Sequence, residues 1–194
     1  VRMNGRDILQ LPESEMRTIR GKQISMIFQE PMLSLNPVLT IAEQINEVLQ
    51  RHFNHPPKTA QARILELLDQ VGIPDAARRM HEYSFQFSGG MKQRAMIAMA
   101  LAGEPELLIA DEPTTALDVT VQATILDLMR KLRDSHDMGI VFITHDLDEA
   151  LRLGDRIAIL KDGLLVQVGT PEDILLDPAT DYVADFTRDV NLSR

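Results

Sequence analysis

The sequence contains no cysteine and no tryptophan, and aromatic residues make up only 4% of its 194 residues. Without cysteine the chain has no disulfide, no thiolate metal site and no thiol nucleophile, which fits a reducing compartment. No apolar run approaches the roughly 20 residues of a membrane-spanning helix, so we expect membrane association only through a partner. Hydrophobic residues at 44% and charged residues at 25% are ordinary for a globular domain with one core.

The sequence also has fewer basic than acidic residues, 20 against 29, and no phosphate-binding loop of the usual pattern. The net charge is −9 with no compensating basic stripe, which argues against a nucleic-acid partner. No stretch fits G-x-x-x-x-G-K-[ST], because Gly21-Lys22 is followed by Gln23 and has no partner glycine at the required spacing. The chain opens at Val1 with neither an initiator Met nor an apolar signal segment, and we expect it to begin inside a longer pattern.

Apolar runs alternate with helical patterns in the second half of the chain. The run from Leu107 to Ala110 is typical of a central parallel strand, and Gly139–Thr144 predicts a second buried strand. The Asp162-Gly163 pair between two further runs predicts a hairpin. Strand and helix alternation therefore predicts an α/β fold with a mostly parallel sheet. The expected strands are Gly21–Gln29, Leu107–Ala110, Gly139–Thr144, Arg156–Leu160 and Leu164–Val168.

The segment between the first two of these strands is helical in pattern. Thr40 and Glu43 form a capping box before apolar residues at helical spacing. A second helix is expected to end at Gly72 and Pro74. We therefore predict one partial domain over 1–194, with a helical subdomain at 31–101 and the remaining sheet core at 102–194.

Two acidic residues, Asp111 and Glu112, follow the Leu107–Ala110 strand. Ligands of an open parallel sheet bind beyond the carboxyl ends of its strands. Phosphoryl transfer to water needs Mg²⁺ to neutralise charge and a group that positions the water. We expect Asp111 to hold Mg²⁺ and Glu112 to orient or deprotonate the attacking water. An isolated acidic pair would better fit a solvated turn. Because Thr114, Thr115 and Asp118 follow at this spacing, the solvated turn is less favoured here.

Ser88, Gly89 and Gly90 open a helix rich in alanine and methionine. Backbone N–H groups at a helix N-terminus, unhindered at two glycines, bind anions. The Ser88 hydroxyl adds a donor for a terminal phosphate, and Gln93 lies just beyond. A lone S-G-G would otherwise be read as a glycine-rich turn.

Gln29 is the last residue of one expected strand, and His145 follows another. An imidazole there can hydrogen-bond a γ-phosphate or the attacking water, and an amide can reach Mg²⁺ or water. Alone, each would be a polar surface residue. Asp146, Asp148 and Glu149 predict a solvated helix start.

In their order along the chain, these motifs resemble the nucleotide-binding subunit of an ABC transporter. The resemblance rests on Ile27–Pro31 (Q-loop), Phe87–Met91 (signature), Leu107–Glu112 (Walker B), Thr115–Asp118 (D-loop) and Thr144–Asp146 (switch histidine). Glu30–Pro37 and Ser88–Leu101 are similar to the peptide and dipeptide import branch. Leu151–Phe186 is similar to the osmoprotectant branch.

The resemblance implies a P-loop NTPase-like (RecA-like) core that lacks its N-terminal strands and its Walker A loop. It also implies ATP and Mg²⁺ as cofactors, with Asp111 and Gln29 at the metal and Glu112 and His145 in catalysis. Gln29, Ser88, Gly89, Gly90, Gln93 and Asp118 would contact nucleotide. A second ATPase subunit and transmembrane permease subunits would be the partners, at the cytoplasmic face of the plasma membrane.

Two alternatives remain open at this stage. The chain can be a catalytically silent fragment that acts only as a structural or dimerisation module, which binding of Mg-ATP would contradict. ABC ATPases of DNA repair would place long heptad repeats between Q-loop and signature, where only about three short helices fit.

Overall fold

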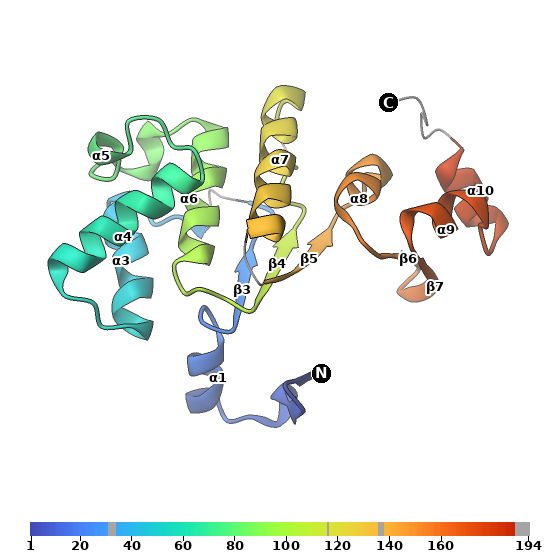
Figure 1. Ribbon diagram of the computed structural model, residues 1–194, viewed down its shortest axis with the longest axis horizontal. Coiled ribbons are helices and arrows are strands. Elements are labelled where there is room, and N and C mark those ends of the chain that lie inside the picture. The colour runs from blue at the N-terminus through green and yellow to red at the C-terminus, as the bar shows by residue number, and fades with distance from the viewer. Residues whose placement is uncertain (31–33, 116, 136–137, 189–194) are drawn as a thin grey trace. The chain divides into compact units, whose positions relative to one another are not determined.

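The computed structural model describes residues 1–30, 34–115, 117–135 and 138–188. These form two compact units, Val1–Val141 and Phe142–Arg194 (Figure 1). The predicted helical subdomain (31–101) and remaining core (102–194) stay predictions. Among the described residues, no helix combines the length and apolar character needed to cross a membrane.

The first unit is organised around a parallel pair of strands. Strand β3 (Ile24–Ile27) runs parallel to β4 (Leu107–Asp111), with Ile24 opposite Leu107 and Ile27 opposite Ala110. Leu108 and Ala110 are fully buried, as expected of a central strand. The strand order β3-β4-β5 confirms the predicted sheet and brings the carboxyl ends of β3 and β4 to one edge.

Strand β5 (Gly139–Ile143) differs from the prediction of a buried strand. Val141 is 46% exposed and Ile143 is 44% exposed. Successive side chains of a strand point to opposite faces, and these two share one face. That face of β5 is therefore exposed, and the prediction of a buried strand is wrong on this point.

A group of helices separates β3 from β4 in sequence. It comprises α3 (Ile41–His52), α4 (Pro57–Gln70), α5 (Ala76–Arg79) and α6 (Gly89–Leu101). The predicted capping box at Thr40 is present: Thr40 N–H donates to Glu43 Oε2 (2.7 Å) and Glu43 N–H donates to Thr40 Oγ1 (3.2 Å). Figure 1 shows α3, α4 and α6 packed together, and they bury Leu49, Leu67 and Ile97 almost completely.

Helix α6 is fixed at its carboxyl end and along its length. A Cβ atom on Gly103 would lie 1.5 Å from the Gly21 carbonyl oxygen, so only glycine allows this segment to meet the start of β3. Arg94 Nη1 donates to the carbonyl oxygens of Val71 (2.8 Å) and Gly72 (3.2 Å), where α4 ends. The helix is therefore tied both to the sheet and to α4.

Other elements complete the first unit. Helix α7 (Val119–Ser135) buries Ile125, Leu128, Met129 and Leu132 along one stripe. The N-terminal segment comprises β1 (Arg2–Met3), β2 (Arg6–Asp7), η1 (Ile8–Gln10) and α1 (Glu13–Ile19). The two-residue strands among them are not predictable from sequence, because they are too short to carry a periodic signal.

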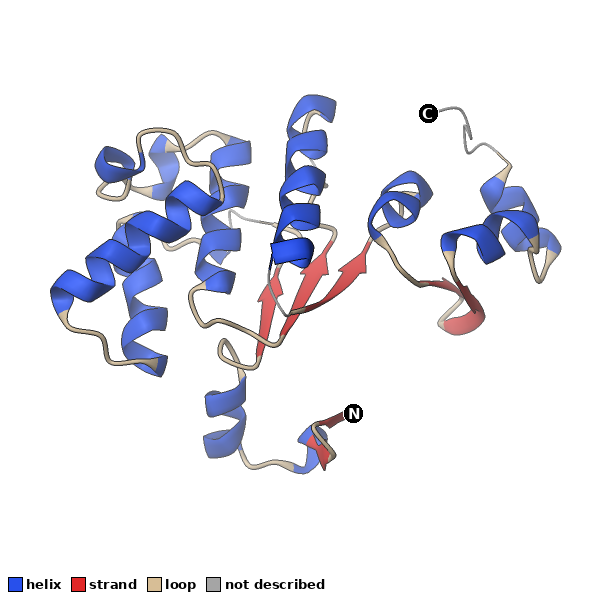
Figure 2. Cartoon of the chain, in the orientation of Figure 1, coloured by secondary structure: helices blue, strands red, loops and turns tan. Residues whose placement is uncertain are grey.

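The second unit contains α8 (Leu147–Leu153), β6 (Ile157–Lys161), β7 (Leu164–Gly169), α9 (Pro171–Leu176) and α10 (Asp181–Thr187) (Figure 2). The predicted hairpin is confirmed: β6 and β7 are antiparallel, and Asp162 and Gly163 both have positive φ, 51° and 77°. Two left-handed residues match the right-handed twist of hairpin strands. The buried core of the second unit consists of Ile157, Ile159, Ile174 and Val183.

Candidate functional site

The centre of the site is the turn that follows β4. Asp111 is the last residue of the strand, and Glu112 after it has φ of 44°. A left-handed conformation costs a residue with a Cβ atom about 1–2 kcal/mol. The turn is closed by Thr115 N–H, which donates to the Glu112 carbonyl oxygen at 3.1 Å. Such strain at a strand end is found where a side chain is held for a function.

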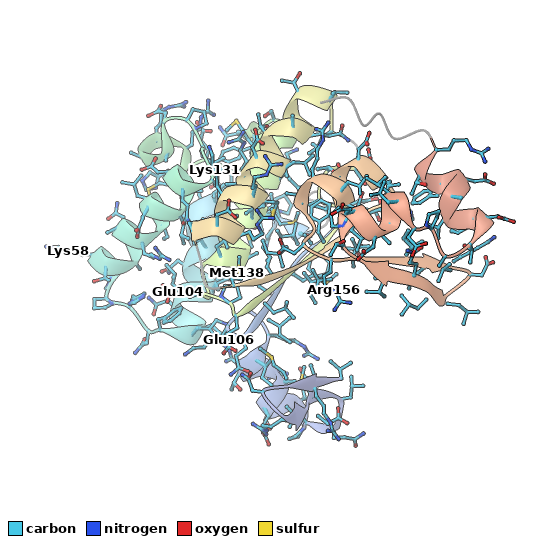
Figure 3. The ribbon with its side chains drawn as sticks, turned by 45° about the vertical axis from the view of Figure 1, so that its right-hand side comes forward. Lys58, Glu104, Glu106, Lys131, Met138 and Arg156 are labelled. Atoms are coloured by element: carbon cyan, nitrogen blue, oxygen red, sulfur yellow. The ribbon has the colours of Figure 1, made fainter. Side chains whose placement is uncertain are left out.

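The Glu112 carboxylate is held from two directions. Its Oε2 atom accepts hydrogen bonds from Gln29 Nε2 at 2.7 Å and from Thr115 Oγ1 at 2.8 Å. Gln29 and Glu112 follow neighbouring parallel strands, β3 and β4, so the sheet places them together although they are 83 positions apart. Glu106, labelled in Figure 3, precedes β4 and so marks its opposite end.

Thr115 is a further residue of the site, beyond those expected from the sequence. Its hydroxyl contact with Glu112 depends on a tight turn three residues long, and Ser or Thr hydroxyls bond locally in many such turns without a functional role. A threonine three positions after the second carboxylate was the available signal. Of the D-loop motif, Ala116 lies outside the described residues, as do Pro31–Leu33 after Gln29.

The residues fit a magnesium ion that arrives with nucleotide. Within the described parts of the chain, no group of three or more His, Cys, Asp or Glu side chains could hold a metal ion unaided. Mg²⁺ keeps several waters and binds through one or two carboxylates together with substrate phosphates. Asp111 offers one half-buried carboxylate, whereas the Gln29 amide is engaged with Glu112. Asp111 and Gln29 as metal contacts stay predictions.

Ser88 is the N-cap of α6, as the sequence predicted for the start of this helix. Its Oγ accepts from Met91 N–H at 3.4 Å, so its own hydroxyl hydrogen points elsewhere. A Cβ atom on Gly90 would lie 2.7 Å from Val121 Cγ1 on α7, whereas one on Gly89 would meet only Leu117 Cδ2 at 3.9 Å. Gly90 is therefore required for packing as well as for any anion at this helix end.

Gln93 and Asp118 have clear structural positions. The Gln93 side chain is 1% exposed, and its Nε2 has no hydrogen-bond partner among the described residues. Contact with a nucleotide would require it to leave this buried position, and that contact stays a prediction. Asp118 caps the start of α7, since its Oδ1 accepts from Val121 N–H at 3.0 Å. Its contact with nucleotide also stays a prediction.

His145 lies in the second unit, exposed, in the short loop between β5 and α8. Asp146 caps α8, since its Oδ1 accepts from Asp148 N–H (2.8 Å) and Glu149 N–H (3.3 Å). The prediction that Glu149 is solvated is wrong: it is 5% exposed, and its Oε2 accepts from Thr144 Oγ1 at 2.6 Å. First-turn glutamates are commonly solvated, and this contact depends on the conformation of the loop that begins five residues earlier.

Comparison with known proteins finds similar sequences over nearly the whole chain. A sequence profile described as ABC transporter matches residues 1–115. The oligopeptide transport ATP-binding protein OppD of Bacillus subtilis (strain 168) is 51% identical over 178 residues, covering 92% of this chain and 50% of that protein. The dipeptide transport ATP-binding protein DppD of the same strain is 49% identical over 177 residues, covering 91% of this chain and 53% of that protein. The chain thus spans about half the length of these relatives.

Solved structures agree on the fold. A dimeric post-hydrolysis state of the ATP-binding cassette MJ0796 bound to ADP and Pi is 31% identical, with a TM-score of 0.77, over 87% of this chain and 72% of that one. A second dimeric structure of the same bacterial ABC transporter cassette is 32% identical, with a TM-score of 0.74, and the match covers 84% of this chain and 69% of that one. The predicted P-loop NTPase-like fold is confirmed. From its matching profile, its relatives and its fold, this chain belongs to the ABC transporter family as an ATP-binding domain.

Proposed function

We propose that the chain is the ATP-hydrolysing part of an importer subunit that energises uptake of peptides or dipeptides. The observation that carries the proposal is the contact of Gln29 with Glu112 at the carboxyl ends of two parallel strands. An amide and a carboxylate at this edge can act together on one water molecule near a bound phosphate. Thr115 holds the same carboxylate oxygen from the other side.

In the proposed reaction, Glu112 orients the attacking water and accepts its proton. Asp111 would hold Mg²⁺, which when bound supplies charge neutralisation at the phosphates. His145 would hydrogen-bond the terminal phosphate or the attacking water. The left-handed turn and the two hydrogen bonds at Glu112 mean that its carboxylate is positioned before the substrate arrives.

The amino-terminal end of α6 is proposed to serve a nucleotide held by a second ATPase subunit. Ser88, Gly89 and Gly90 place a hydroxyl and unhindered N–H groups at a helix N-terminus, a favourable site for a phosphate. The dimeric state of the MJ0796 cassette supports pairing of two such domains.

The proposed cargo follows from the relatives. OppD and DppD are named for oligopeptide and dipeptide transport, and their similarity extends over more than nine-tenths of this chain. This extent favours peptides over osmoprotectants, although the osmoprotectant-like C-terminal part stays a prediction. Permease subunits would dock beside Gln29 and the helices α3 to α6, which would hold the domain peripherally at the cytoplasmic membrane surface.

The experiment is Glu112→Gln in the full-length subunit assembled with its permease. We expect ATP turnover to be lost while nucleotide binding persists, because the amide keeps the shape but cannot accept a proton. Glu106→Gln is the matched control, since Glu106 is an exposed glutamate at the opposite end of β4. Turnover of Glu112→Gln at the parental rate would contradict the role of Glu112. Calorimetry with Mg-ATP on the chain itself addresses the silent-fragment alternative, which micromolar affinity would exclude.

A further inference from the structure

The loop that carries His145 is held on both sides by hydrogen bonds that connect Thr144, Asp146 and the buried Glu149. Thr144 immediately precedes His145, and its Oγ1 donates to Glu149 Oε2 at 2.6 Å. The same oxygen accepts from Asp146 N–H at 3.0 Å, on the far side of His145. One hydroxyl group therefore joins the residue before His145, the residue after it and the first turn of α8.

The burial of Glu149 gives this network its rigidity. Glu149 is 5% exposed, and a buried carboxylate is costly unless hydrogen-bond donors satisfy it. A donor lost at Thr144 would leave the buried oxygen without this partner, so the Thr144 hydroxyl cannot rotate away cheaply. Asp146 fixes the other side, because its Oδ1 accepts the N–H groups of Asp148 and Glu149.

We propose that Thr144 and Glu149 are positioning residues that fix the backbone on either side of His145 and thereby aim its imidazole. The inference rests on the proposed function, because the role of His145 at the phosphate is part of it. Neither residue touches the substrate in this proposal; both act through His145. All of the contacts lie within the second unit and so depend on that unit alone.

The test is a set of variants in the full-length subunit assembled with its permease. Thr144→Val keeps the shape and removes the hydroxyl, whereas Thr144→Ser restores it. Small displacements of a catalytic group cost up to about 100-fold in rate, so we expect Thr144→Val to lower kcat by roughly 10- to 100-fold. KM for ATP should stay within about twofold, and Thr144→Ser should recover most of the rate.

Two readouts separate positioning from a general loss of stability. The His145 Cε1–H resonance, identified by its disappearance in His145→Ala, should move in Thr144→Val and return in Thr144→Ser. In the His145→Ala background, Thr144→Val should have little further effect on kcat, because it acts through an imidazole that is no longer present. Thr170→Val is the matched control: Thr170 caps α9 through Asp173 N–H at 3.2 Å in the same unit, and its loss should change neither readout.

Each outcome is decisive. The proposal is overturned if Thr144→Val leaves the resonance in place, or if its loss of kcat is equally large without His145. It is also overturned if Thr170→Val has the same effects. Should Thr144→Val not fold, Thr144→Ala carries the same expectations. If Glu112→Gln keeps the parental turnover, the proposed function fails, and the His145 resonance alone then decides the positioning role.

Discussion

Removal of the Thr115 hydroxyl is the most direct probe of how Glu112 is held. Thr115→Val preserves the side-chain shape but deletes the 2.8 Å hydrogen bond to Glu112 Oε2. The Thr115 N–H bond to the Glu112 carbonyl oxygen remains, so the turn itself should persist. The carboxylate then loses one hydrogen-bond donor, keeps the bond from Gln29 and has greater freedom to rotate.

The magnitude follows from the exposure of the two groups. A hydrogen bond to a charged group contributes up to about 3 kcal/mol, and a typical one about 1 kcal/mol. Because Thr115 is exposed and Glu112 only half-buried, the lower figure applies. If the transition state is stabilised by about 1 kcal/mol less, kcat falls roughly fivefold. KM for ATP should not change, because Glu112 is not expected to bind the ground-state nucleotide.

The assay is steady-state ATP hydrolysis by the proposed subunit assembled with its proposed permease. Thr115→Ser should return kcat to within about twofold of the parent. Thr124→Val is a matched control, since Thr124 is an exposed threonine on α7 whose hydroxyl donates to the Val121 carbonyl oxygen at 2.7 Å. Parental kcat in Thr115→Val, or an equal loss in Thr124→Val, would refute the reasoning.

Two further predictions concern stability. Gly90→Ala would place a Cβ atom 2.7 Å from the stiff, branched side chain of Val121. We expect the free energy of unfolding in urea to fall by about 1 kcal/mol, after the usual gain from alanine in a helix. Adding Val121→Ala should recover this stability, and no recovery would contradict the contact. Hydrogen bonds from the Thr40 backbone and side chain lower the pKa of Glu43 in the folded protein. The contribution of Glu43 to stability is therefore complete above its unfolded pKa, about 4.3, and is lost as pH falls through the lower folded pKa. The difference in thermal midpoint between the parent and Glu43→Gln should therefore shrink below about pH 4, and a constant difference would contradict it.

The parts of the fold that sequence predicted are those set by local rules. The start of α6 at Ser88 and of α3 at Thr40 follows from side-chain caps. The β6–β7 turn follows from the Asp162-Gly163 pair, and β4 from its continuous apolar run. Each of these signals lies within a few residues of the structure that it specifies.

The parts that sequence did not predict depend on residues that are distant in the chain or on a specific turn. Burial of Glu149 under the Thr144 hydroxyl cannot be told from a solvated first-turn glutamate. The exposure of one face of β5 depends on what packs against that face, which its apolar residues do not encode. The site itself was partly predictable, since Gln29 and Glu112 each follow a strand, but their hydrogen bond required the register of β3 on β4.

The attachment of α6 at Gly103 and Arg94 has a mechanical consequence. With 13 residues, the helix is a stiff rod about 20 Å long, at 1.5 Å per residue. Gly103 abuts the Gly21 carbonyl oxygen at one end, and Ser88 sits at the other. A tilt of about 10° around the Gly103 end would swing Ser88 by roughly 3.5 Å over that length. Arg94 would move the end of α4 with it, because its guanidinium is bonded to both carbonyl oxygens there. The whole helical group would therefore rotate together about the contact between Gly103 and Gly21.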